Sequence, residues 1–285
     1  MTQRRGWLAL PLALVLSLAP AVARAQVPFM TGIDATAAPH AMPKLGGGIQ
    51  GFQVDLFNEV ARRLDRGIVF APARFADLLP ALHDGRYDFL AAPVTVTPER
   101  AEVLLFTQGY LWTSCRFGLR QGAPPVQDWA DLAGKAVAVV AGTACADLAG
   151  TSAEANGFTV QAFNAGFDAV RAVVSGTADA ALAADTVIRY AERTNPMFAA
   201  GMVLPDTRAP WAAPFRTDSA ALRGQVDDVL KCMKQDGTVA KLSEKWFGVA
   251  PTPDDLQRLV LPGHGIPGLP GYDPDAPDPD CSQYR

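Results

Sequence analysis

The chain alternates short apolar strands with amphipathic helices, and it does so in two consecutive blocks. In the first block Leu56, Val60 and Leu64 recur every four residues, which is the spacing of one face of an α-helix. The predicted segments are a helix over 51–64, a strand over 67–70, a helix over 75–88 that closes at Gly85, and an apolar strand over 89–92. Strands and helices that alternate in this order predict an α/β fold, with a mostly parallel sheet flanked by helices.

The second block repeats this pattern. Its predicted segments are a strand over 135–141, a helix from 144, a helix from 167 to a turn at Gly176, and a strand over 180–183. Two stretches, 109–119 and 201–215, are interpreted as crossings between the blocks, and 219–247 as a helical return. Two lobes joined by two crossings leave a cleft, where the carboxyl ends of strands and the N-termini of helices meet.

These segments divide the chain into five parts. Lobe 1 comprises 26–112 and 208–250, lobe 2 comprises 113–207, and a tail rich in proline and glycine covers 251–285. Residues 1–25 have the layout of a secretory signal peptide: Arg4 and Arg5, an apolar stretch, and Ala23-Arg24-Ala25. We therefore expect export and cleavage before Gln26.

The charge and the histidines exclude several partners. The formal net charge is −4, and removal of the leader takes away three arginines and no acid. A negative balance argues against nucleic acid or an anionic membrane as the main partner. The three histidines are far apart in the sequence, so we expect no metal and no cofactor.

All four cysteines follow the leader, and export places them in an oxidising compartment. Three pairings are possible. We favour Cys232 with Cys281, because that disulfide would hold the irregular tail, with its eight prolines and four glycines, against the fold. Cys115 would then pair with Cys145.

Few residues can carry chemistry. Thr97-Pro98-Glu99-Arg100 has the pattern of a helix start, so Arg100 is either a solvated residue of a capped turn or a cleft residue that binds a carboxylate. Gly142-Thr143 joins a predicted strand to a predicted helix. It is either an ordinary turn or an anion site at a helix N-terminus.

Two further residues have an open role. Phe75 begins an amphipathic helix, so it belongs either to the core or to an aromatic face for the ligand. Asp34 follows the first strand and either caps a loop or accepts a hydrogen bond from a ligand. Gly46 to Gly48 lack the context of a phosphate-binding loop.

Four segments in order resemble the extracellular solute-binding proteins of family 3, the periplasmic polar amino-acid receptors of ABC importers. The segments are GFQVDLFNEVARRL, FADLLPALHDGRYDFLAAPVTVTPERAEVLLFTQGY, DLAGKAVAVVAGTACADLAG and DGTVAKLSEKWFG, and the resemblance covers roughly residues 30 to 249. It implies the two-lobed type II periplasmic-binding-protein fold with a two-strand hinge. It also implies a monomer in the periplasm that binds a small carboxylate-bearing ligand and delivers it to a membrane ABC permease.

The resemblance assigns most of a ligand site. The family's carboxylate-binding arginine falls on Arg100, its small hydroxyl residue on Thr95, and its ammonium-binding carbonyl on Pro93. The Gly-Thr cradle for the carboxylate falls on Gly142 and Thr143.

The other half of the site departs from the family. The aromatic residue falls on Phe75 and the early aspartate on Asp34, but the usual tyrosine is Ala37. The acid that binds the α-ammonium group falls on Ala184, and Asp185 is one residue further on. A slip of one residue in a strand turns a side chain to the opposite face, so Asp185 would reach the ligand only through a bulge. The ligand is then either an amino acid or a small carboxylate of another kind.

Two functions from different classes fit these residues. The favoured function is a binding protein whose lobes close over a carboxylate held by Arg100 and Thr143. The alternative is a cleft enzyme of the same fold, a lyase similar to cyclohexadienyl dehydratase, with Asp185 or Asp34 as the general acid. Ala184, at the position where an acid is expected, argues against the enzyme.

Overall fold

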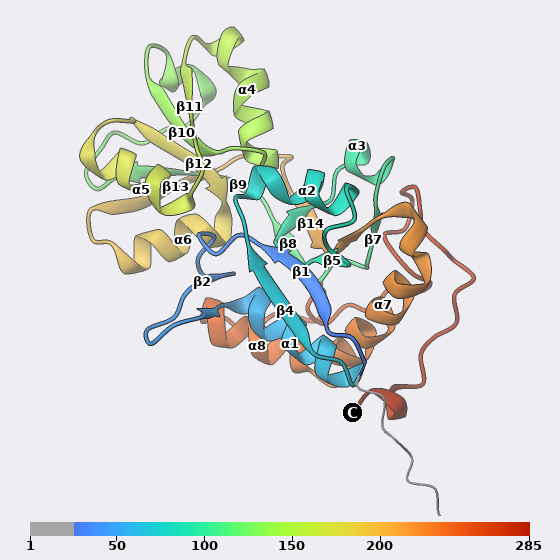
Figure 1. Ribbon diagram of the computed structural model, residues 1–285. Helices are drawn as coiled ribbons and strands as arrows, with labels where there is room; N and C mark the ends of the chain where they lie inside the picture. Colours follow the sequence, from blue (N-terminus) through green and yellow to red (C-terminus); the bar gives the residue numbers. More distant parts are fainter. Residues whose placement is uncertain (1–25) are drawn as a thin grey trace, which may run out of the picture.

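The computed structural model describes residues 26–285, and the predicted leader lies outside them. Lobe 1 contains a parallel sheet in the order β4-β1-β5 (Figure 1). Its strands are β1 (Phe29–Ile33), β4 (Ile68–Pro72) and β5 (Phe89–Leu90), and its first helices are α1 (Phe52–Arg63) and α2 (Phe75–His83). A hairpin of β2 (Met42–Pro43) and β3 (Ile49–Gln50) precedes α1. The predicted strand–helix alternation is confirmed here.

Lobe 2 contains a five-stranded sheet in the order β11-β10-β12-β9-β13. The strands are β9 (Cys115–Arg120), β10 (Ala136–Val140), β11 (Thr159–Phe163), β12 (Ala180–Ala184) and β13 (Phe198–Val203). The helices are η1 (Trp129–Leu132), α4 (Ala144–Asn156), α5 (Gly166–Ser175) and α6 (Asp185–Thr194). β10, β11 and β12 are parallel, whereas β9 pairs antiparallel with β12 and β13. This sheet is therefore mixed, because β9, which follows the first crossing, runs against the other four strands.

The two crossings pair with each other. β8 (Leu111–Thr113) and β14 (Ala209–Ala212) are antiparallel neighbours, and β6 (Val94–Thr95) joins β14 on its other side. Lobe 1 also contains α3 (Pro98–Ala101), β7 (Leu105–Phe106), β15 (Pro214–Phe215) and η2 (Thr217–Ser219). The helical return consists of α7 (Ala220–Gln235) and α8 (Thr238–Phe247). The two helices are separated at Gly237, whose φ of 79° is a left-handed conformation that glycine adopts without strain.

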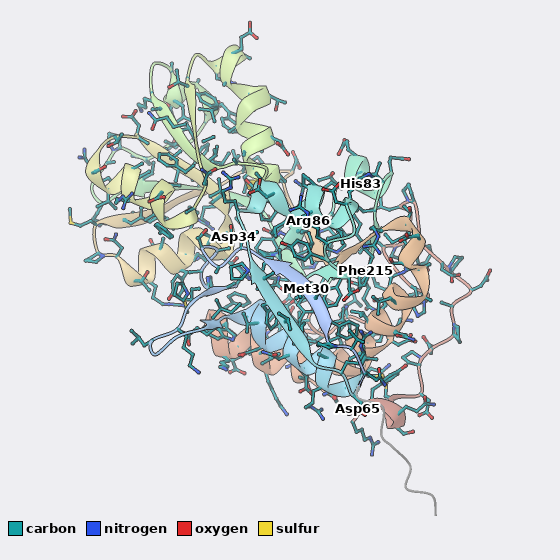
Figure 2. All side chains as sticks on the ribbon, in the orientation of Figure 1. Met30, Asp34, Asp65, His83, Arg86 and Phe215 are labelled. Atoms are coloured by element: carbon teal, nitrogen blue, oxygen red, sulfur yellow. A yellow bond between two sulfur atoms is a disulfide. The ribbon has the colours of Figure 1, made fainter. Side chains whose placement is uncertain are left out.

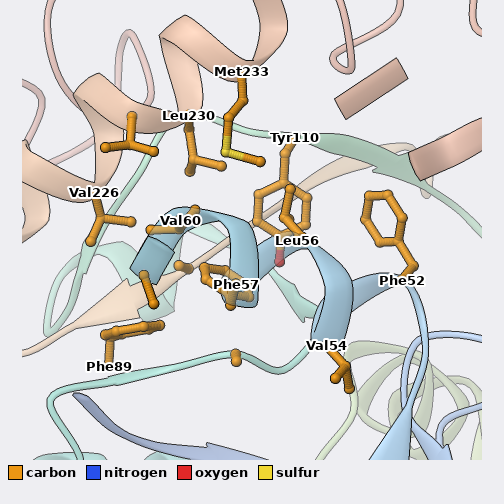
Figure 3. Packing of buried hydrophobic residues seen from close by; sticks show 14 of the residues in the cluster. Phe52, Val54, Leu56, Phe57, Val60, Phe89, Tyr110, Val226, Leu230 and Met233 are labelled. Carbon is orange, nitrogen blue, oxygen red and sulfur yellow. The ribbon is translucent and has the colours of Figure 1, made fainter. Parts of the chain in front are cut away.

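The core of lobe 1 forms around α1. The residues that predicted this helix, Leu56 and Val60, are fully buried, and α1 also buries Phe57 (Figure 3). They pack in one cluster with residues of α7 such as Leu230 and Met233. The return segment thus completes the core of the first block.

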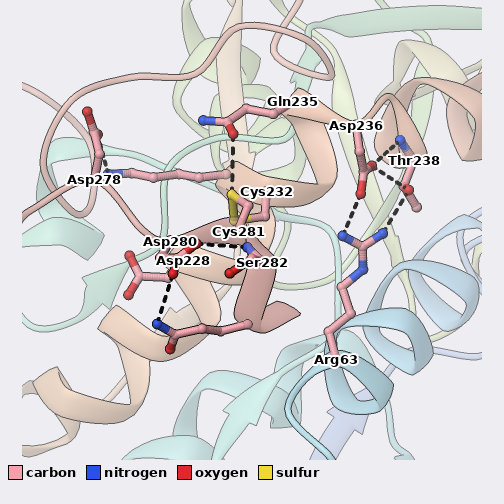
Figure 4. The surroundings of a disulfide bond; sticks show 12 residues. Arg63, Asp228, Cys232, Gln235, Asp236, Thr238, Asp278, Asp280, Cys281 and Ser282 are labelled. Atoms are coloured by element: carbon pink, nitrogen blue, oxygen red, sulfur yellow. Dashed lines mark hydrogen bonds and ion pairs between the residues drawn. A yellow bond between two sulfur atoms is a disulfide. The ribbon is translucent and has the colours of Figure 1, made fainter. Parts of the chain in front are cut away.

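The tail (251–285) runs along α7 with little regular structure and ends in the 3-10 helix η3 (Cys281–Tyr284) (Figure 1). The structure joins Cys232 to Cys281, the favoured pairing, with the Cα atoms 5.4 Å apart (Figure 4). Polar contacts also hold the tail. The fully buried Lys234 on α7 donates to the Leu259 carbonyl (3.0 Å) and to the Gly109 carbonyl (2.7 Å), and burial lowers the pKa of Lys234 to about 7.

Within residues 26–285, none of the helices has both the length and the apolar character needed to cross a bilayer.

Candidate ligand-binding site

A cavity of about 70 Å³ lies between the two lobes. The lobe 1 residues that line it are Asp34, Ala37, Phe75, Pro93, Thr95 and Trp211. The lobe 2 residues that line it are Val140, Thr143, Ala144, Cys145, Gly166, Ala183, Ala184 and Val187. The lobes touch beside the cavity, where the Gly166 N–H donates to the Thr36 hydroxyl (3.0 Å) and His40 Nε2 lies 2.7 Å from the Thr186 hydroxyl. The structure is therefore a closed form.

Asp34 follows β1 directly, so the end of this strand carries its carboxyl group to the junction of the lobes (Figure 2). It is 3% exposed. Its Oδ1 accepts hydrogen bonds from the Thr36 backbone N–H (2.8 Å) and hydroxyl (2.7 Å). Burial raises the pKa of Asp34, and the two bonds from Thr36 oppose that effect. Because both bonds fall on Oδ1, Oδ2 keeps its capacity for a group in the cavity.

Arg100 lies in α3, and its guanidinium faces the other lobe. The helix starts as the sequence predicts, because the Thr97 hydroxyl accepts from the Arg100 backbone N–H (3.3 Å). Nη1 donates to the Thr95 carbonyl (3.0 Å), and Nη2 donates to the Gly142 carbonyl of lobe 2 (3.0 Å). Burial lowers the pKa of Arg100, and Asp147, 3.8 Å away, opposes the shift. Arg100 stands beside the cavity and does not line it.

Gly142 also stands beside the cavity and does not line it. Its φ is +79°, and a Cβ at this position would lie 2.9 Å from the Cα of Ala76 in lobe 1. The turn and the close approach of the two lobes therefore both require glycine here.

Thr143 lines the cavity as the N-cap of α4. Its hydroxyl accepts from the Ala146 N–H (3.2 Å) and donates to the Val140 carbonyl (2.8 Å). The hydroxyl is thus used by the helix start, as in an ordinary turn. What α4 offers the cavity is its positive end, where the N–H groups of Ala144 and Cys145 have no acceptor within the helix.

Three other predicted contacts reach the cavity from lobe 1. Phe75, the first residue of α2, belongs both to a buried cluster and to the cavity wall, so its two predicted roles coexist. Pro93 and Thr95 line the cavity around β6. Ala37 also lines it, at the position where the family has a tyrosine.

Asp185 requires a correction, because the structure does not bring it to the cavity. β12 pairs with β9 in unbroken register up to Ala184, which is opposite Cys115. Without a bulge, Asp185 begins α6 and its carboxylate pairs with Arg116 and with Arg189 (3.0 Å). Ala184 itself lines the cavity. The wall of lobe 2 is therefore apolar where the resemblance expects an acid.

Two lining features extend the predicted site. Sequence reasoning missed Trp211 on β14, which is 2% exposed and whose indole N–H donates to the Thr95 hydroxyl (2.9 Å). The only signal was a large aromatic residue within the predicted second crossing.

The disulfide between Cys115 and Cys145 is the second feature, with the Cα atoms 5.7 Å apart. Because Cys145 lines the cavity, this disulfide braces the wall of lobe 2.

Two α/β lobes, a paired two-strand crossing and a cavity between the lobes define the class of type II periplasmic binding proteins. Within this class, the chain belongs to the bacterial extracellular solute-binding proteins, family 3, whose sequence pattern matches residues 29–249.

Individual relatives agree with this membership. The chain is 30% identical to the amino-acid-binding protein AabA of Dichelobacter nodosus over 206 residues, 70% of this chain and 80% of AabA. An ancestral arginine-binding protein bound to arginine superimposes with a TM-score of 0.74 at 27% identity, over 79% of this chain and 100% of that one. The ancestral amino acid-binding protein AncCDT-1, a precursor of cyclohexadienyl dehydratase, superimposes with a TM-score of 0.72 at 28% identity, over 77% of this chain and 95% of that one. The chain is therefore a solute-binding protein.

Proposed function

We propose that the ligand is a small carboxylate without an α-ammonium group. The cavity volume of about 70 Å³ favours a small ligand. The carboxylate would lie at the positive end of α4, near Arg100. The two carbonyl bonds of Arg100 use two of its five N–H donors, so others are free for a carboxylate.

The observation that carries this proposal is the apolar wall formed by Ala183, Ala184 and Val187. An ammonium group buried against these three hydrocarbon side chains would lose its hydration without gaining a counter-ion on the lobe 2 wall. Asp34 is the one carboxylate among the lining residues; it lies on lobe 1, and Thr36 occupies its Oδ1 but leaves Oδ2 free.

The ligand would act as a bridge between the lobes. Contacts to Arg100 on one side and to α4 on the other exist together only in the closed form, so binding shifts the equilibrium toward closure. We propose the predicted boundaries, 26–112 with 208–250 and 113–207, as the two moving bodies. The protein would act as a periplasmic monomer after cleavage before Gln26, and the closed form would be recognised by an ABC permease.

The experiment is a thermal-shift and calorimetric comparison of four probes of similar size: propionate, lactate, pyruvate and alanine. At a hundred times Kd a ligand adds about 2.7 kcal/mol, which raises the melting temperature by roughly 5–11 °C. We expect binding of at least one of the first three and weaker binding of alanine. Arg100→Ala should weaken it at least about 100-fold, because it removes the charged partner of a buried carboxylate. Arg74→Ala, at an exposed arginine paired with Asp77, is the control and should leave Kd unchanged.

Three results would contradict the proposal. Alanine as the tightest ligand would show that an α-ammonium group is accepted. Carboxylate binding that survives Arg100→Ala would show that the arginine is not the anchor. Absence of binding by the whole panel would overturn the proposed ligand class.

The enzyme alternative now depends on Asp34 alone, since Asp185 lies outside the cavity. Its raised pKa is the property that a general acid needs. Incubation with a prephenate-like substrate, followed by NMR, tests it. We expect no turnover, and turnover that disappears in Asp34→Asn would favour the enzyme.

A further inference from the structure

One face of α6 contacts lobe 1 outside the cavity. Thr186, Tyr190 and Arg193 have the spacing i, i+4 and i+7, which places them along one side of this helix. Of the residues of α6, only Val187 lines the cavity. The other three side chains contact three different segments of lobe 1, and α6 therefore spans the junction of the lobes beside β2 (Figure 1).

The contact at the first turn of α6 involves a buried histidine. His40 is fully buried, and its Nε2 lies 2.7 Å from the Thr186 hydroxyl. Its Nδ1 has no hydrogen-bond partner among residues 26–285, so the bond to Thr186 is the one that this imidazole makes there. A hydrogen bond that joins the lobes is lost when they separate, and it therefore favours the closed form.

The contact at the last turn of α6 is a helix cap supplied by the other lobe. α8 ends at Phe247, and its last carbonyl groups have no N–H partner within the helix. Arg193 Nη1 donates to the Phe247 carbonyl (3.4 Å), and Nη2 donates to the Trp246 carbonyl (3.3 Å). A cation at this position also lies at the negative end of the helix dipole. Arg193 of lobe 2 thus caps a helix of lobe 1 while the lobes are closed.

Tyr190 lies between these two contacts. Its hydroxyl donates to the Met42 sulfur on β2 at 3.3 Å. The guanidinium carbon of Arg193 lies 5.3 Å from the centroid of the Tyr190 ring, so the ring supports the group that caps α8. All these contacts join protein groups to protein groups. Their contribution to closure is therefore the same for every ligand.

We propose that this face of α6, the α6 latch (Thr186, Tyr190 and Arg193), sets how far the lobes close before a ligand binds. The affinity for a ligand that is held by the closed form is scaled by the fraction of protein in that form. The latch therefore changes the affinity for every ligand by the same factor, although it touches none of them. This inference goes beyond the proposed ligand class and does not depend on it.

The test uses two variants and one matched control. Arg193→Ala removes the cap on α8, and Thr186→Val removes the hydroxyl at nearly constant shape. Arg189→Ala is the control, because Arg189 is an exposed arginine of the same helix that pairs with Asp185 of its own lobe (3.0 Å). Small-angle X-ray scattering measures the radius of gyration of the free protein. Calorimetry measures Kd for propionate, lactate and pyruvate.

The closing equilibrium constant should fall about threefold in Arg193→Ala and about tenfold in Thr186→Val, because an exposed hydrogen bond contributes less than a buried one. If the free protein is mainly closed, its radius of gyration should increase. If it is mainly open, Kd should rise by the same factor for every probe that binds, with faster dissociation. Arg189→Ala should leave the radius and Kd unchanged.

Three results would overturn the inference. The first is an unchanged radius together with unchanged affinities in both variants. The second is an equal change in Arg189→Ala. The third is a loss of affinity that differs more than twofold between probes, since a latch that touches no ligand cannot discriminate among them. If no probe binds the wild type, the proposed ligand class fails instead. The radius of gyration then decides the latch alone: an increase supports it, and an unchanged radius overturns it.

Discussion

The two walls of the cavity differ in chemistry. Lobe 1 contributes the Asp34 carboxyl, the Thr95 hydroxyl and the indole of Trp211, whereas lobe 2 contributes mainly small apolar side chains such as Ala183 and Ala184. The polar groups of lobe 2 at the cavity are backbone N–H groups at the start of α4. Lobe 1 can therefore recognise a ligand by side-chain hydrogen bonds, while lobe 2 recognises it by shape and by the helix dipole.

The largest effect should come from the disulfide that braces the lobe 2 wall. Replacement of Cys115 and Cys145 by serine opens a loop of 30 residues and should lower the free energy of unfolding by up to about 3–4 kcal/mol. Because Cys145 lines the cavity, we also expect ligand affinity to fall about tenfold. Denaturant unfolding and calorimetry measure the two effects.

The second disulfide provides the matched control. Replacement of Cys232 and Cys281 opens a loop of 49 residues far from the cavity, so stability should fall by a similar amount, up to about 4 kcal/mol. Affinity should stay within twofold of the wild type. Equal losses of affinity in both double variants would show that the Cys115–Cys145 disulfide is not specifically part of the binding wall.

An intermediate effect should follow from acid, through His40 at the contact between the walls. Burial lowers the pKa of His40 to about 3, from about 6.5 in the unfolded chain. Between these values the unfolded state binds the proton and the folded state does not, so stability falls as the pH falls below 6.5. The loss is roughly 1.4 kcal/mol per pH unit, or about 2 kcal/mol at pH 5.

The measurement is the free energy of unfolding between pH 7 and 5, where most carboxylates stay ionised. His40→Gln should flatten this dependence. His83→Gln, at an exposed histidine near the end of α2, should retain it. A slope that is the same in His40→Gln and the wild type would show that His40 does not cause the loss.

The smallest effect should come from a carboxylate placed on the apolar wall. Ala184→Asp introduces a counter-ion at the position where the resemblance expects one, so the affinity for alanine relative to propionate should rise about tenfold. Ala184→Asn, which has the same shape without the charge, should change this ratio less than twofold. Equal ratios in the two variants would mean that charge on this wall does not decide the ligand class.

Local signals predicted much of the fold and part of the site. The Thr97 pattern predicted the start of α3, and the Gly142-Thr143 pair predicted the start of α4; both caps depend on neighbours within a few residues. The apolar spacing that includes Leu56 predicted the buried face of α1. The mostly parallel sheet of lobe 2 was predicted, but the antiparallel direction of β9 within it was not, because that direction depends on the partners of β9 and not on its own residues.

The alternation of strands and helices and the helix starts follow from the sequence, since they depend on side-chain periodicity and capping. Which side chains face the ligand cavity depends on long-range contacts. Asp185 lies outside the cavity because β12 keeps its register up to Ala184. Trp211 lines the cavity because β14 pairs with β6. The physical reason is the range of the interactions: a cap forms between near neighbours, whereas the bond from Trp211 to Thr95 joins residues 116 positions apart.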